Sequence, residues 1–144
     1  MVRYDVQMID AGVDDSWWNA LIRHFVSPGD AFEIRCWREE LEEVKKASPY
    51  GKLSLAGFRN HEVSIKGKVS PDLLRQLLED KPRDKDIYNK MTSYFTINVE
   101  NDRCKLSSAH YGTEVYLDIF HEEDQAFFGG LMANYGDDFV LAKV

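Results

Sequence analysis

The sequence predicts an α+β fold, built as a mainly antiparallel sheet with about four helices packed on it. Two observations support this prediction. Segments with the two-residue alternation of strands are interspersed with segments that have the three-to-four-residue apolar spacing of helices. The later strand-like segments follow one another closely, which is typical of an antiparallel meander. The length of 144 residues, without an internal repeat or a linker, predicts a single globular domain over residues 1–144.

Eight segments have the composition or the alternation of strands. They cover residues 2–9, 31–37, 53–58, 61–69, 94–100, 103–110, 112–120 and 137–144. Four segments have the apolar spacing and the flanking residues of helices. They cover residues 11–26, 38–48, 70–80 and 122–134. The polar segment 81–86 is predicted to be a loop.

Capping residues and apolar positions give more detailed predictions for the helices. Asp15 or Ser16 is predicted to cap the first helix, and Ser70 the third. The second helix is predicted to turn Leu41 toward the core. The pair Gly129–Gly130 weakens the last helix, and we attribute its presence to close packing.

The net charge of −7 is concentrated in the last third of the chain. Residues 106–142 contain no Lys or Arg and seven acids: Glu114, Asp118, Glu122, Glu123, Asp124, Asp137 and Asp138. Such a surface repels phosphate groups and attracts basic proteins. We therefore expect a basic protein partner and no nucleic acid.

The two cysteines and the N-terminus indicate an intracellular protein. Cys36 and Cys104 each lie in a strand-like segment without zinc-type spacing, which predicts buried, reduced thiols. The first residues lack the apolar core of a signal peptide, and no apolar run approaches the roughly 18 residues of a membrane span. The sequence therefore predicts a cytoplasmic protein with no membrane contact, no cofactor and no metal.

Residues 107–124, SSAHYGTEVYLDIFHEED, are the richest in potential catalytic groups. On a strand, Glu114 and Asp118 would share a face but lie about 13 Å apart. The carboxylates of glycosidase pairs are less than about 10 Å apart, so these two acids do not form such a dyad alone. We therefore interpret the stretch as a solvated strand followed by a helix start.

An enzyme remains the alternative hypothesis. A small hydrolase or metal-dependent enzyme would need His110, His121 and Asp118 to converge, with His61 as a further ligand. The familiar nucleophile and phosphate-loop motifs are absent from the sequence, and no residue is assigned a catalytic role.

Aromatic residues provide candidate contacts for a protein partner. Tyr111, Tyr116 and Tyr135 lie in the acidic third of the chain, where rings beside carboxylates suit a basic partner. Trp17 adjoins Trp18 on the first helix, and both rings cannot lie at the centre of one narrow stripe. Trp17 is therefore either part of a broad buried face or a partly exposed anchor.

The sequence hypothesis is a protein-binding protein without enzyme activity. We expect an immunity or inhibitor protein that blocks the basic active site of a toxin, nuclease or defence enzyme. Its predicted contact residues are Trp17, Tyr111, Glu114, Tyr116, Asp118, Glu122, Glu123, Asp124, Tyr135, Asp137 and Asp138. The expected assembly is a monomer or a weak homodimer formed through an exposed edge strand.

Overall fold

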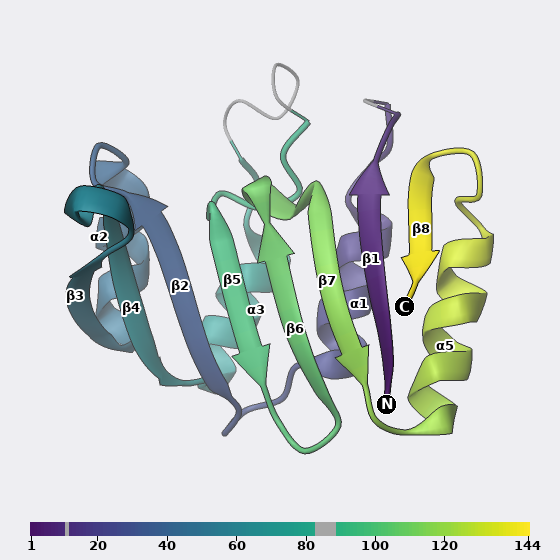
Figure 1. Cartoon of the computed structure of the whole chain (residues 1–144). Helices are drawn as coiled ribbons and strands as arrows, with labels where there is room; N and C mark the ends of the chain where they lie inside the picture. Colours follow the sequence, from purple (N-terminus) through teal and green to yellow (C-terminus); the bar gives the residue numbers. More distant parts are fainter. Residues whose placement is uncertain (11, 83–88) are drawn as a thin grey trace.

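The computed structural model describes residues 1–10, 12–82 and 89–144, and within them eight antiparallel strands form one sheet with four helices (Figure 1). The predicted α+β fold is confirmed. The strands are β1 (Val2–Met8), β2 (Ala31–Trp37), β3 (Lys52–Ala56), β4 (Glu62–Lys68), β5 (Thr96–Glu100), β6 (Cys104–Ala109), β7 (Glu114–Ile119) and β8 (Phe139–Lys143). The helices are α1 (Ser16–Phe25), α2 (Leu41–Ala47), α3 (Pro71–Glu79) and α5 (Glu122–Ala133). Most of the predicted loop over residues 81–86 lies outside the described residues.

The strand order brings the two ends of the chain together. The order across the sheet is β3-β4-β2-β5-β6-β7-β1-β8, and each neighbouring pair is antiparallel. β1 lies between β7 and β8 and is hydrogen-bonded to both, so the first strand of the chain joins two of its last three strands (Figure 1). β3 and β8 are the edge strands.

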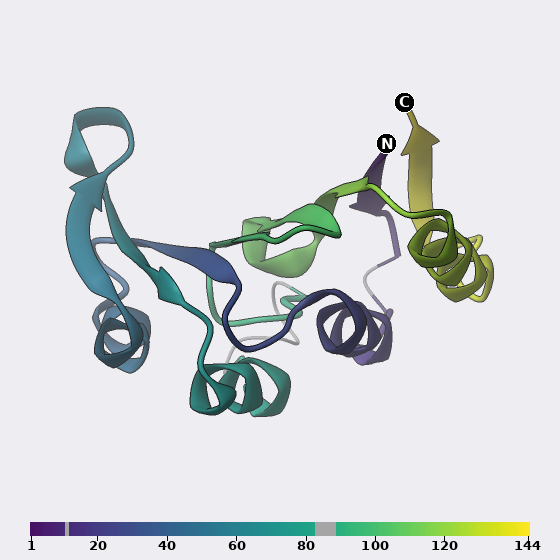
Figure 2. The ribbon, with the colours of Figure 1, turned by 90° about the horizontal axis from the view of Figure 1, so that it is seen from below.

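All four helices lie on one side of the sheet (Figure 2). Alternation along each strand sends apolar side chains toward the helices and polar side chains to the other side. In β1, for example, Tyr4 and Val6 are buried under the helices, whereas Arg3 and Asp5 face outward. We call the uncovered side the open face. Both ends of the sheet turn away from the helices in Figure 2, so the open face is concave.

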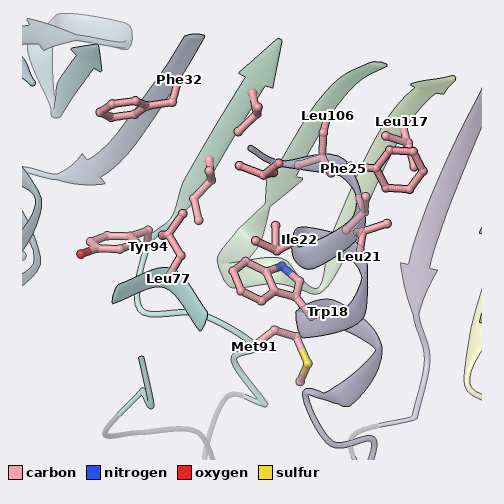
Figure 3. Close-up of a cluster of buried hydrophobic side chains, with 14 of the residues drawn as sticks. Trp18, Leu21, Ile22, Phe25, Phe32, Leu77, Met91, Tyr94, Leu106 and Leu117 are labelled. Carbon is pink, nitrogen blue, oxygen red and sulfur yellow. The ribbon is translucent and has the colours of Figure 1, made fainter. Parts of the chain in front are cut away.

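Helix α1 supplies the centre of the core (Figure 3). Its predicted stripe is fully buried and consists of Trp18, Leu21, Ile22 and Phe25. Trp17 is also fully buried and packs edge-on against Phe139, with ring centroids 4.6 Å apart. The broad buried face is therefore correct, and Trp17 is not an exposed anchor. Trp17 is covered because β8, at the edge of the sheet, brings the ring of Phe139 against it.

Three local predictions need correction. Leu41 is exposed, because the preceding Glu40 takes the inward place and accepts hydrogen bonds from the Trp37 N–H and the Tyr111 hydroxyl. Asp15 is the N-cap residue of α1 but makes no capping hydrogen bond, whereas Ser70 does cap α3. A Cβ at Gly129 or Gly130 would touch nothing within 4 Å, so close packing does not explain this pair.

None of the helices among the described residues combines the length and the apolar composition that a membrane span requires.

Candidate functional site

The tertiary structure joins the acidic C-terminal third to an acidic N-terminal segment. Residues 1–15 and 113–144 together carry eleven acids and two bases, whereas the rest of the chain carries fourteen acids and sixteen bases. These two segments contain β1, β7, α5 and β8, which lie at one end of the sheet (Figure 1). We call this end the acidic pole. The net negative charge of the acidic pole is larger than that of the whole protein.

Carboxylates crowd one another within the pole. The backbone oxygen of Asp138 accepts hydrogen bonds from the N–H groups of Ile9 and Asp10. Desolvation and the neighbouring Asp10 carboxyl raise the pKa of Asp138 above its ordinary value. Burial, together with Asp14 and Asp138, raises the pKa of Tyr135. A cation placed here would relieve this mutual repulsion.

Two of the predicted contact acids already form ion pairs with other residues of the protein. Asp124 is buried, and it accepts hydrogen bonds from Arg103 and lies 2.8 Å from His24 Nε2. Asp118 accepts two hydrogen bonds from Arg3, at 2.6 and 2.9 Å. The hydrogen bonds from Arg3 are the main cause of the lowered pKa of Asp118. Asp124 is therefore engaged within the fold, and Asp118 presents a charge that Arg3 offsets.

The open face contains a hollow of about 660 Å³ beside the acidic pole. Strand register aligns six of its side chains in a row across the sheet: Lys66, Glu33, Asn98, Ser107, Tyr116 and Asp5. The middle of this row is neutral and carries amide and hydroxyl groups. A carboxylate lies on each side of it, and Asp5 is the one that belongs to the acidic pole.

The two carboxylates of this row differ in their surroundings. Glu33 accepts hydrogen bonds from Ser64 Oγ at 2.6 Å and from Asn98 Nδ2 at 3.1 Å. Burial is the largest influence and acts to raise the pKa of Glu33, but these hydrogen bonds and the charges of Arg35 and Lys66 together lower it. The Asp5 carboxylate makes no hydrogen bond or ion pair within the described part of the chain, because the nearby Arg3, which it attracts at longer range, is held by Asp118. Asp5 is therefore available to an incoming cation.

A second row on the open face is internally balanced. Glu100, Lys105, Asp118 and Arg3 lie on β5, β6, β7 and β1 and are paired in register. Lys105 Nζ lies 3.6 Å from Glu100 Oε1, and Arg3 binds Asp118. The charges of this row alternate, so it adds little net charge to the hollow.

The remaining predicted contact residues are distributed over different surfaces. Tyr116 is exposed in the hollow, and its hydroxyl donates to Glu114 Oε2 at 2.8 Å. Glu122 and Glu123 are exposed in the first turn of α5, and Asp137 lies beyond the other end of that helix. Tyr111 lies outside the two segments that form the acidic pole.

Tyr111 belongs to an aromatic group with Phe95 and Trp37, where β2 ends and β5 begins. Its hydroxyl donates to Glu40 Oε2 at 3.0 Å, and its ring lies 5.3 Å from that of Phe95. The Lys90 ammonium group lies 3.9 Å from the centre of the Tyr111 ring. This tyrosine is engaged in the fold through its hydroxyl and its ring.

The residues of the enzyme hypothesis do not converge. His110 precedes β7 and His121 follows it, so the length of the whole strand separates them. His110 Nδ1 lies 3.1 Å from Glu114 Oε2, while Asp118 is held by Arg3. His61 follows the β3–β4 turn, several strands away. Among the described residues, no group of three or more His, Cys, Asp or Glu is arranged to hold a metal ion.

Sequence reasoning missed Asp5 and Glu33. The alternation of β1 and β2 indicates that both side chains lie opposite the apolar face. This alternation is visible in the sequence, but it does not show that β1 and β2 flank the same hollow. Only the strand order supplies this information.

No protein-family model, curated protein or solved structure matches the chain.

Proposed function

We propose that this protein binds a basic protein partner through the acidic pole and the adjoining open-face hollow. The observation that supports this proposal is the pairing of β1 with β7 and β8, which unites eleven acids with only two bases. Clustered carboxylates of this kind accelerate the approach of a basic protein at low ionic strength.

The hollow provides the anchoring site in this proposal. An arginine or lysine side chain of the partner enters beside Asp5 and Tyr116, where the carboxylate forms no ion pair with any described residue and the ring supplies apolar area. The neutral floor of Asn98 and Ser107 offers hydrogen bonds to the same group. Because the hollow adjoins the acidic pole, the long-range attraction brings a basic partner close to the anchor.

The biological role that fits this surface is that of an immunity or inhibitor protein. Toxins, nucleases and defence enzymes that act on anionic substrates have basic active sites, and a carboxylate-rich surface can occupy such a site in place of the substrate. Mechanistically, the acids guide the approach and the aromatic and polar groups of the hollow hold the complex. We place this encounter in the cytoplasm, which the buried thiols favour.

The first experiment is affinity capture from an extract of the source organism at low and at moderate salt. The wild-type protein is compared with the pole variant Asp5→Asn/Glu122→Lys/Glu123→Lys. All three positions lie in the acidic pole, and Glu122 and Glu123 are exposed. The control is Glu39→Lys/Glu79→Lys, which reverses two exposed acids outside the pole.

The expected result is a basic protein that wild type and control retain, that salt releases, and that the pole variant loses. With the purified partner, the pole variant should associate at least tenfold more slowly at low salt, with a weaker salt dependence. Equal effects of the pole variant and the control would show that the charge acts without a defined site. Retention of the same partner by the pole variant would contradict the proposal.

A further inference from the structure

The second feature of the molecule that points to an interaction lies at the opposite end of the sheet. β3 is an edge strand that is paired on one side, by β4. On its other side no described residue is hydrogen-bonded to the backbone of residues 52–56. An unpaired strand edge is a template for another extended strand.

The side chains of β3 do not protect this edge. Leu53 and Leu55 pair in register with Ile65 and Val63 on the helix-facing side of the sheet, yet they remain 48% and 53% exposed. Edge strands that resist association are usually very short or carry charged side chains, especially lysine, a proline or a bulge. β3 is short and begins with Lys52, but it pairs continuously with β4 and its helix-facing side carries only Leu53 and Leu55. Its neighbour Phe58, just beyond the strand, is also exposed.

The charge distribution distinguishes this edge from the other one. The β8 edge also exposes two apolar side chains, Val140 and Leu141, but it belongs to the acidic pole. Two copies that met through β8 would bring two strongly acidic surfaces together. Residues 45–68, which include β3 and β4, carry six bases and one acid, an excess of five charges against nine at the acidic pole, so the repulsion between two copies is weaker at the β3 edge.

The sequence of β3 is complementary to itself in the antiparallel direction. If KLSLA pairs with a second KLSLA about a two-fold axis at Ser54, Leu53 lies opposite Leu55 of the second copy. The four leucines then form one apolar cluster on the helix-facing side. Lys52 lies opposite Ala56 of the second copy, so the two lysines are about 13 Å apart and do not repel strongly.

We propose that β3 pairs with β3 of a second copy of this chain, which forms a two-fold symmetric dimer with a continuous sheet. Five residues on each side bury an area in the range of weak interfaces, below about 1,200 Å². The dimer is therefore concentration-dependent. It places the two acidic poles at its outer ends, where both remain accessible to a basic protein.

Sedimentation velocity of the full chain between about 10 μM and 1 mM tests the dimer. The wild-type sedimentation coefficient should rise with concentration, whereas Leu53→Lys/Leu55→Lys should remain monomeric. The matched control is Val140→Lys/Leu141→Lys, which makes the same change on the other edge and should behave as wild type. A monomeric wild type at every concentration, or a loss of the dimer in the β8 variant alone, would overturn the proposal.

Disulfide crosslinking tests the register and does not depend on the lysine variants. Directly opposed Cα atoms of antiparallel strands are about 4.5–5.5 Å apart, which a disulfide bridges. Ser54→Cys should therefore form a crosslinked dimer under mild oxidation, and Lys52→Cys should not. Cys36 and Cys104 are buried and do not interfere. Equal crosslinking of both variants would refute this register.

The dimer does not rest on binding of a basic partner. The Leu53→Lys/Leu55→Lys variant should still retain that partner in the capture experiment, because the acidic pole is unchanged. A failure of either proposal is thus distinguishable from a failure of the other.

Discussion

Asp124, in the first turn of α5, binds Arg103 of the β5–β6 turn through two hydrogen bonds, from Nη2 to Oδ1 at 2.8 Å and from Nε to Oδ2 at 3.2 Å. His24 at the end of α1 approaches the same carboxylate, and its ring stacks on Phe127 with centroids 3.7 Å apart. Three segments that are distant in sequence therefore meet at one buried acid. The Arg103–Asp124 pair holds the first turn of α5 in place at the edge of the acidic pole.

Asp124→Asn should lower the free energy of unfolding at pH 7 by about 1–3 kcal/mol, because it removes a charge-assisted pair at a buried site. The hydrogen bonds from Arg103 lower the pKa of Asp124 below its ordinary value of 3.8. The stabilisation is therefore present above that value and is lost as the pH falls through the lower, folded-state pKa. Urea unfolding at pH 7 and pH 3 should show a smaller difference between variant and wild type at pH 3.

The control for this prediction is Asp72→Asn. Asp72 pairs with Arg75 on α3, but both side chains are largely exposed. Such pairs contribute little, so this variant should stay within about 0.5 kcal/mol of wild type. Similar losses in both variants would contradict a special role for the Asp124 site.

Ser108→Ala should destabilise the protein by about 1–3 kcal/mol, because Trp18 Nε1 donates to Ser108 Oγ at 3.0 Å in the core. Without the hydroxyl, a buried indole N–H has no acceptor. The adjacent Ser107 points to the open face, so Ser107→Ala is the control and should be nearly neutral. Thermal unfolding of the two variants compares the two faces of one strand, and an equally stable Ser108→Ala would refute the prediction.

Gly112→Ala should be strongly destabilising, by about 2 kcal/mol or more. Gly112 has a φ of 85°, and a Cβ there would lie 2.7 Å from Met91 Cβ and 3.0 Å from Trp18 Nε1. Gly129→Ala on α5 should instead stabilise by about 0.5–1 kcal/mol, because alanine favours a helix and the space is open. Chemical unfolding should therefore show shifts of opposite sign, and shifts of the same sign would contradict the structure.

Both cysteines should be unreactive in the native protein. Burial is the main cause that raises the pKa of Cys36 and of Cys104 to about 12. At pH 8 only about one thiol in ten thousand would then be ionised. A thiol reagent should react with neither until urea is added, whereas the Ser54→Cys variant should react with one equivalent at once. Rapid reaction of wild-type protein would contradict this burial.

Arg3→Gln should accelerate binding of the basic partner. Arg3 offsets the charge of Asp118 on the open face, so its removal leaves the acidic pole more negative. Asp5→Asn should act in the opposite direction. Stopped-flow association at low salt should therefore rank Arg3→Gln above wild type and Asp5→Asn below it, and the reverse order would contradict the assignment of the surface.

The sequence by itself determined the elements and their faces. Period-two alternation located β1 and β2, and Ser70 marked the start of α3, because these signals depend on residues close together in the chain. The excess of acids in residues 106–142 was equally visible, and it led to the predicted basic partner.

Only the tertiary structure decided how those elements were combined. The insertion of β1 between β7 and β8 extended the acidic surface and placed Asp5 beside Tyr116. Packing against Phe139 buried Trp17, and Arg103 turned Asp124 from a surface charge into an internal one. These outcomes depend on contacts between residues roughly twenty to more than a hundred positions apart. Local propensity does not encode such contacts, because strand order is set by how the whole apolar face is covered.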